Sequence, residues 1–258
     1  SSTSRGLGDV YKRQVNIVSS IILAIGLFCV WLKIGRKLRA PLAILRPQTS
    51  WMSREIYVAG IFFGSVALYF FEPNSLFLTS AAIGAGLFLY CQGRILHSGK
   101  GIPTWRVSQM PLMLVATGLL EGICLSAVLH FGWDSEISVT SILPPAAIIL
   151  ILFNSFLWRR YARNAKVWGI SPIDRNIIGS LSPKLYIFGH CIPLILFGIA
   201  FFVPNTESSI VCIASLLALI GSILWKATII TRACHMQNFA LGKMPHRGSG
   251  KFAAPVIN

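Results

Sequence analysis

Long apolar runs alternate with polar segments along the chain. Each run is close to the length of about 20 residues that a helix needs to cross a bilayer. The runs cover residues 15–32, 56–71, 75–90, 110–131, 137–158, 185–203 and 210–230. None of them shows a sustained alternation of apolar and polar residues, which favours helices over barrel strands. The pattern predicts an all-α fold, a polytopic transmembrane helix bundle with seven visible spans.

The charged residues between the runs also alternate in sign. Lys and Arg gather after the first, third, fifth and seventh runs, whereas the other connections carry Glu72, Asp134, Glu136 and Glu207. Positive residues mark the cytoplasmic loops of membrane proteins. This pattern predicts a multi-pass protein of the bacterial cytoplasmic (inner) membrane with a cytoplasmic C-terminus and an external N-terminal end.

Composition excludes a water-soluble globule. The 258 residues are 54% hydrophobic and 12% charged, with a mean hydropathy of +0.68, whereas soluble domains carry about 25% charged residues. The net charge of +15 follows from the cytoplasmic loops, so we expect no nucleic acid as a partner. The six cysteines form no C-x-x-C pair, which argues against an iron–sulfur or zinc framework.

The chain divides into three regions. Residues 4–14, S-R-G-L-G-D-V-Y-K-R-Q, match the in-frame translation of a transposon-end adaptor used in sequencing libraries. We therefore expect residues 1–14 to be an adaptor or cloning scar and natural sequence to start near Val15. Residues 15–232 form the predicted transmembrane anchor domain, and residues 233–258 form a cytoplasmic C-terminal tail.

Two acidic residues are candidates for chemistry. Glu55 begins the second run beside Arg54, where either a functional role or a favourable first-turn carboxylate explains it. Glu121 lies near the middle of the fourth run, where an ionisable group is costly and suggests function. The alternative for Glu121 is a protonated carboxyl group that hydrogen-bonds between helices which approach closely at Gly118 and Gly122.

The histidines do not form a pattern for haem. A transmembrane b-type cytochrome needs paired axial histidines on facing helices, whereas the five histidines lie near span ends, in loops or in the tail. We predict no haem, no metal ligand and no cofactor bound in this chain.

Several segments resemble those of a known family. L-K-I-G-R-K-L-R-A and R-P-Q-T-S-W-M-S-R-E (residues 32–40 and 46–55), together with G-R-I-L-H-S-G-K-G-I-P-T-W-R (residues 93–106) and L-L-E-G, resemble the dimethyl sulfoxide reductase membrane-anchor subunits (DmsC-type) within the wider polysulfide-reductase (NrfD-like) anchors. The tail F-A-L-G-K-M-P-H-R-G is similar to anchors of phenylacetyl-CoA:acceptor oxidoreductases. Such anchors usually have eight spans, so the resemblance implies a further span upstream.

The resemblance implies a non-catalytic anchor in a redox complex of three subunits. A molybdopterin catalytic subunit and a four-cluster iron–sulfur subunit would be its partners, and menaquinone or ubiquinone its substrate within the lipid. The family's functional carboxylate matches Glu55, which we expect to exchange protons. Glu121 is a second candidate for proton exchange because of its depth in the span, and we expect no catalytic residue in the chain. The resemblance places the quinone site on Lys33, Arg36, Arg39, Trp51, Arg54 and Glu55.

A small multi-span transporter is the competing interpretation. It would explain Glu121 and the prolines of the fifth and sixth runs, since transporters bind substrates at broken helices. Pro144 and Pro145 predict a kink near the start of the fifth helix. No internal repeat and no matching pair of broken helices supports this alternative.

Reporter fusions test the predicted topology. Fusions on the basic side are expected to read cytoplasmic, and fusions on the acidic side external, because Lys and Arg hold their loops inside. The cytoplasmic set follows Gly99, Trp168 and Met244, and the external set follows Pro73, Asp134 and Asn205. A single inverted reading would contradict the seven-span arrangement.

Overall fold

The fold is a helical bundle. The computed structural model describes residues 2–33, 44–132, 142–203 and 208–236, and these ranges contain helices and connections but no strand. The helices are α1 (Ser2–Lys33), α2 (Trp51–Phe71), α3 (Ser75–His97), α4 (Met110–Gly132), α5 (Leu143–Asn164), α6 (Pro172–Lys184), the π-helical segment η3 (Leu185–Cys191), α7 (Ile192–Phe202) and α8 (Ser208–Thr231). The predicted all-α class is confirmed.

Six helical segments in the described ranges are long and apolar enough to cross a membrane. They lie in α1, α2, α3, α4, α8 and a continuous helix of 31 residues made by α6, η3 and α7. The helix α5 falls short because Pro144, Pro145, Arg159 and Arg160 dilute its apolar sequence. The chain is an integral membrane protein, and the seventh span stays a prediction.

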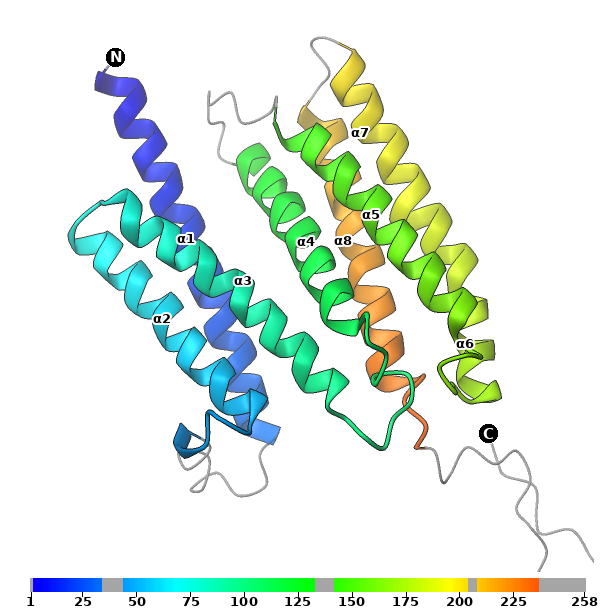
Figure 1. Cartoon of the computed structure of the whole chain (residues 1–258). Coiled ribbons are helices and arrows are strands. Elements are labelled where there is room, and N and C mark those ends of the chain that lie inside the picture. Colours follow the sequence, from blue (N-terminus) through cyan, green and yellow to red (C-terminus); the bar gives the residue numbers. More distant parts are fainter. Residues whose placement is uncertain (1, 34–43, 133–141, 204–207, 237–258) are drawn as a thin grey trace, which may run out of the picture.

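The helices pack as two groups joined through α3 and α4 (Figure 1). The antiparallel pair α2 and α3 forms one group, with α1 in contact with α2. The other group contains α4, α5, α7 and α8, and α4 lies between α3, α5 and α8. The end of α1, the α3–α4 connection and the end of α8 all lie at the lower end in Figure 1. We call this the basic end, because it includes Arg54, Arg94 and Arg106.

Side-chain caps and prolines set the helix starts. Ser50 and Asn74 accept backbone hydrogen bonds at the starts of α2 and α3, which satisfies donors that the first turn leaves open. Pro144 and Pro145 occupy the first turn of α5. The expected kink is therefore wrong, because proline at the first helical positions removes no intrahelical hydrogen bond.

The sixth helix begins well before the sixth apolar run. Ser171 caps Pro172–Lys184, which continues without interruption into η3 and α7. Arg175 and Lys184 are therefore helical rather than part of a loop. The π segment is a local widening of the helix, a feature that often marks functional positions.

The second group is held together by close packing between helices. A cluster on α4, α5, α6 and α8 buries Met110, Trp158, Tyr161 and Ile229 among others. The π segment crosses α8 where Gly189 faces Gly221, and a Cβ atom added to Gly221 would lie 2.5 Å from the Cα atom of Gly189. Small residues allow such backbone contacts between membrane helices.

A methyl group at Gly221 should push α8 and the π segment apart at this crossing. Gly221→Ala is expected to lower the free energy of unfolding by about 1–3 kcal/mol, because the neighbouring atom is backbone and cannot move aside. Gly198→Ala in α7 is the matched control, since nothing lies within 4 Å of its added Cβ atom. Thermal unfolding of the purified chain in detergent measures both, and equal midpoints would contradict the close crossing.

Candidate functional site

The candidate site lies at the basic end, where α2 begins beside the end of α3. Ser50 accepts a hydrogen bond from the backbone N–H of Ser53, 3.4 Å away. This cap starts the helix so that Trp51, Arg54 and Glu55 occupy its first two turns. Residues one turn apart share a helix face, and here that face meets α3.

Trp51 forms the centre of an aromatic and cationic cluster. The guanidinium carbon of Arg54 lies 4.2 Å from the Trp51 ring centroid, and that of Arg94 on α3 lies 4.7 Å from it. Tyr90 meets the indole edge-on, with ring centroids 5.9 Å apart. Cation–π contacts at these distances are favourable, so the indole holds two positive charges close together at the membrane boundary.

Arg54 also fixes the segment that precedes α2. Its Nε donates to the Pro47 carbonyl and a terminal nitrogen donates to the Gln48 carbonyl, both at 2.8 Å. The Tyr57 hydroxyl donates to the Ile44 carbonyl at 3.2 Å. Arg54 therefore has fewer donors left for a ligand than its charge alone suggests.

Arg94 differs from Arg54 in this respect. Its Nε is buried and makes no hydrogen bond within the described part of the chain. Because an unmet buried donor is costly, Arg94 is a stronger candidate than Arg54 to donate to a bound ligand.

Glu55 pairs with a residue that the sequence pattern does not identify. The Gln92 side-chain amide on α3 donates to a Glu55 carboxylate oxygen. Both side chains are half-buried. The close contact of α3 with α4 supports the position of Gln92, since a Cβ atom on Gly93 would lie 2.4 Å from the Cα atom of Pro111. Glu55 is thus oriented by α3, not by its neighbour Arg54.

The structure brings together only part of the predicted quinone set. Trp51, Arg54 and Glu55 lie together on α2, as expected. Lys33 is the last residue of α1, and its side chain lies outside the described part. Arg36 and Arg39 also lie outside the described residues. Gln92 and Arg94 were missed as site residues, although C-Q-G-R at the end of the third apolar run is an unusually polar sequence there.

Glu121 forms an ion pair within the bundle. The Lys226 ammonium nitrogen on α8 lies 2.6 Å from each Glu121 carboxylate oxygen. Each side chain is about a quarter exposed in the bare bundle. The carboxyl group of Glu121 does bridge two helices, and its partner on α8 is an ammonium group. Gly118 does approach α3 at Leu89, whereas nothing lies within 4 Å of a Cβ atom on Gly122.

Lys226 lies within the seventh apolar run rather than in the segment that follows it. The structure places it inside α8, five residues before Thr231. That distance is about 8 Å along the helix axis. A lysine this deep in a span is expected to have a partner, and Glu121 is that partner.

A buried polar group lies next to the π segment. His190 is only 7% exposed, and its Nδ1 has no hydrogen-bond partner among the described residues. It lines a cavity of about 10 Å³ with Thr117 and Asn154, a volume that suits about one water molecule. No group of three or more metal-binding side chains occurs in the described ranges.

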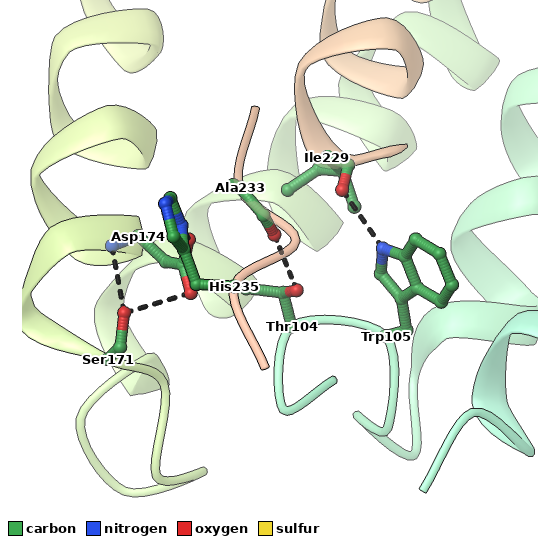
Figure 2. Close-up of polar contacts among 7 residues, drawn as sticks. All are labelled: Thr104, Trp105, Ser171, Asp174, Ile229, Ala233 and His235. Carbon is green, nitrogen blue, oxygen red and sulfur yellow. Dashed lines mark hydrogen bonds and ion pairs between the residues drawn. The ribbon is translucent and has the colours of Figure 1, made fainter. Parts of the chain in front are cut away.

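Hydrogen bonds tie the connections together at the basic end (Figure 2). The Thr104 hydroxyl donates to the Ala233 carbonyl at 2.6 Å, and the Trp105 indole N–H donates to the Ile229 carbonyl at 2.9 Å. Asp174 is fully buried; His235 lies 2.7 Å from one of its oxygens, and the Ser171 hydroxyl lies 2.9 Å from the other. These contacts fix both the α3–α4 connection and the start of α6 to the end of α8.

The fold defines a class of protein: an integral membrane subunit of helices, with Trp51, Arg54, Glu55 and Arg94 gathered at one end. Comparison with protein families then shows that the chain belongs to the DMSO reductase anchor subunit (DmsC) family, whose profile matches residues 9–226. No curated protein and no solved structure matches the chain. The protein is therefore the membrane anchor of a DMSO reductase-type complex and associates with catalytic and iron–sulfur subunits.

Breaking the ion pair should destabilise the bundle. Lys226→Ala is expected to lower the free energy of unfolding by about 2–3 kcal/mol, because it leaves Glu121 unpaired within the membrane. The double variant Glu121→Gln/Lys226→Gln should recover most of that loss, since it removes both charges. Unfolding midpoints in detergent compare the wild type, the single variant and the double variant, with Lys184→Ala at an exposed position as a control. Equal losses in the single and double variants would contradict the pairing.

Proposed function

We propose that the chain is the quinone- or quinol-interacting anchor of a molybdopterin, iron–sulfur oxidoreductase complex in anaerobic electron transport. It passes electrons between the membrane quinone pool and a four-cluster iron–sulfur subunit. The arrangement of Arg94, Trp51 and the Glu55–Gln92 pair at the basic end supports this proposal. It combines donors, an aromatic surface and a proton-exchanging carboxylate at one place.

Quinone chemistry requires those groups together. Reduction of a quinone to a quinol takes two electrons and two protons, and negative charge develops on the carbonyl oxygens as electrons arrive. A guanidinium N–H stabilises that charge, and the buried Arg94 Nε, which has no partner among the described residues, can donate it. Glu55 can supply or accept the protons as a general acid or base, while Gln92 holds its carboxylate in place.

The electrons come from or go to the partners. Clusters of the iron–sulfur subunit carry them to the site, and molybdopterin in the catalytic subunit reacts with the terminal substrate. Docking at the basic end would bring the iron–sulfur subunit close to Trp51. Menaquinone or ubiquinone would reach the same place from the lipid, since α2 and α3 face the membrane along their length.

Orientation follows from the charges. With α5 as a seventh span, the basic end and the C-terminus lie on the cytoplasmic side of the inner membrane. A cytoplasmic catalytic subunit suits a substrate that cannot cross the membrane, such as an acyl-CoA thioester. We therefore propose a relationship to the NrfD-like anchors and to those of phenylacetyl-CoA:acceptor oxidoreductases, with electrons flowing to quinone. The reverse flow to an S- or N-oxide uses the same site.

A transporter is the weaker proposal. Glu121 was its main support, and that carboxylate is paired with Lys226. Membership of the anchor family also favours electron transfer over transport.

The test separates quinone chemistry from assembly. Glu55→Gln is expected to keep the partner subunits bound but to lower quinone-dependent turnover at least about tenfold, because it keeps the shape and removes proton exchange. Activity of the membrane-bound complex with a quinone analogue measures this. A dye-linked assay that bypasses the anchor should be unchanged.

Glu72→Gln is the matched control, since Glu72 ends the same helix at the opposite side. It should leave both activities intact. Full quinone activity in Glu55→Gln, or loss of the partner subunits from its complex, would show that Glu55 serves only the helix start or assembly.

A further inference from the structure

A basic pocket opens on the side of the bundle, away from the start of α2. It lies between α5 and the junction of α6 with η3, and has a volume of about 450 Å³. Its lining residues are Arg159, Ala162, Arg163, Ser182 and Tyr186. None of them belongs to the proposed quinone site, so the function of this pocket is independent of quinone binding.

Two guanidinium groups dominate the pocket. Arg159 and Arg163 are four residues apart on α5 and therefore lie one above the other on the same face. Both are exposed, and neither is ion-paired with a carboxylate in the described part of the chain. Two guanidinium groups at this spacing favour an anion with several oxygens, since arginine binds phosphate through two donors at once.

The polar groups of the other wall have separate roles. The Ser182 hydroxyl donates to the Ile178 carbonyl at 2.7 Å and accepts from the Trp158 indole at 3.1 Å. Ser182 is thereby fixed and shapes the pocket rather than binding a ligand. The half-buried Tyr186 packs its ring against His190, with centroids 5.9 Å apart, which leaves its hydroxyl group as a further donor in the pocket.

The surface around the pocket identifies the source of the anion. Ile149, Leu152 and Phe156 lie on the same face of α5 as the two arginines and are 66%, 53% and 58% exposed. This face is apolar along the span and becomes basic at Arg159. In a membrane protein, that change occurs where acyl chains give way to head groups.

The opposite wall adds one apolar neighbour. Ile187 in η3 directly follows Tyr186 and is 50% exposed. It is available to contact an acyl chain beside the pocket. A soluble anion would use the arginines alone, whereas a lipid would use both the arginines and this apolar surround.

We propose that this pocket binds the phosphate head group of an anionic phospholipid. Arg159 and Arg163 hold the phosphate oxygens, the Tyr186 hydroxyl donates to the same group, and the acyl chains follow Ile149, Leu152 and Phe156 on α5. Basic pockets between spans on the cytoplasmic side are recognised sites for such head groups. The lipid bridges α5 to the helix that carries the π segment.

Lipid retained on the purified complex tests the proposal. Mass spectrometry should find phosphatidylglycerol or cardiolipin on the wild-type complex and at least about threefold less on Arg159→Gln/Arg163→Gln. Arg160→Gln is the matched control, because Arg160 is exposed on the same helix but does not line the pocket. It should retain the wild-type amount.

Adding lipid back separates the possible sources of phosphate. Micelles containing phosphatidylglycerol should raise the unfolding temperature of delipidated wild-type complex, whereas phosphatidylcholine micelles and glycerol 3-phosphate should not. The shift should disappear in the double variant. If that variant fails to accumulate, each single Arg→Gln variant is expected to show a reduced shift.

Three results would overturn the proposal. One is equal lipid retention by the double variant and Arg160→Gln. Another is equal stabilisation by glycerol 3-phosphate, which would indicate a site for a soluble anion. The third is loss of the iron–sulfur subunit from the double variant with lipid retained, which would make the pocket a docking site for that subunit.

Discussion

Hydrocarbon cannot solvate a polar group, and this constraint determines how the helices pair. A charge or amide within a span must find a partner on a neighbouring helix or remain at high cost. Glu121 forms an ion pair with Lys226, and the Asn154 amide donates hydrogen bonds to the carbonyls of Ala116 and Leu150. Glu55 finds Gln92. These contacts lie between helices that also pack closely through small side chains, so polar matching and steric fit select the same neighbours.

The location of the candidate site follows from the same constraint. Glu55 lies one turn inside α2, where Gln92 can orient it and the start of the helix remains near water. Proton exchange needs both conditions, since a carboxylate buried deeper would lose contact with water and one outside the membrane would lose contact with quinone. Glu121 is less suited than Glu55 to proton exchange, because the Lys226 ammonium group already compensates its charge. We therefore propose different roles for the two acidic residues, structural for Glu121 and chemical for Glu55.

The sequence predicted the helices well because an apolar run of span length has few other stable structures. It did not predict that the sixth helix begins at Pro172, since Asp174, Arg175 and Lys184 make its first part polar. The partner of Glu121 was also missed, because a residue 105 positions away is adjacent only after α4 and α8 pack. Within the site, Trp51, Arg54 and Glu55 were found from one local sequence. Gln92 and Arg94 required knowledge of which face of α3 meets α2.

The contacts of the α3–α4 connection have a consequence for biogenesis. Thr104 and Trp105 donate to carbonyls at the end of α8, and Asp174 meets His235 just beyond that helix. During synthesis the end of α8 emerges after α3 and α4 have entered the membrane. Until then, the Thr104 hydroxyl and the Trp105 indole lack these partners, and the Asp174 carboxylate has Ser171 but not His235. Completion of α8 therefore closes the basic end, and a chain that stops before α8 would present an unfinished surface to its partner subunits.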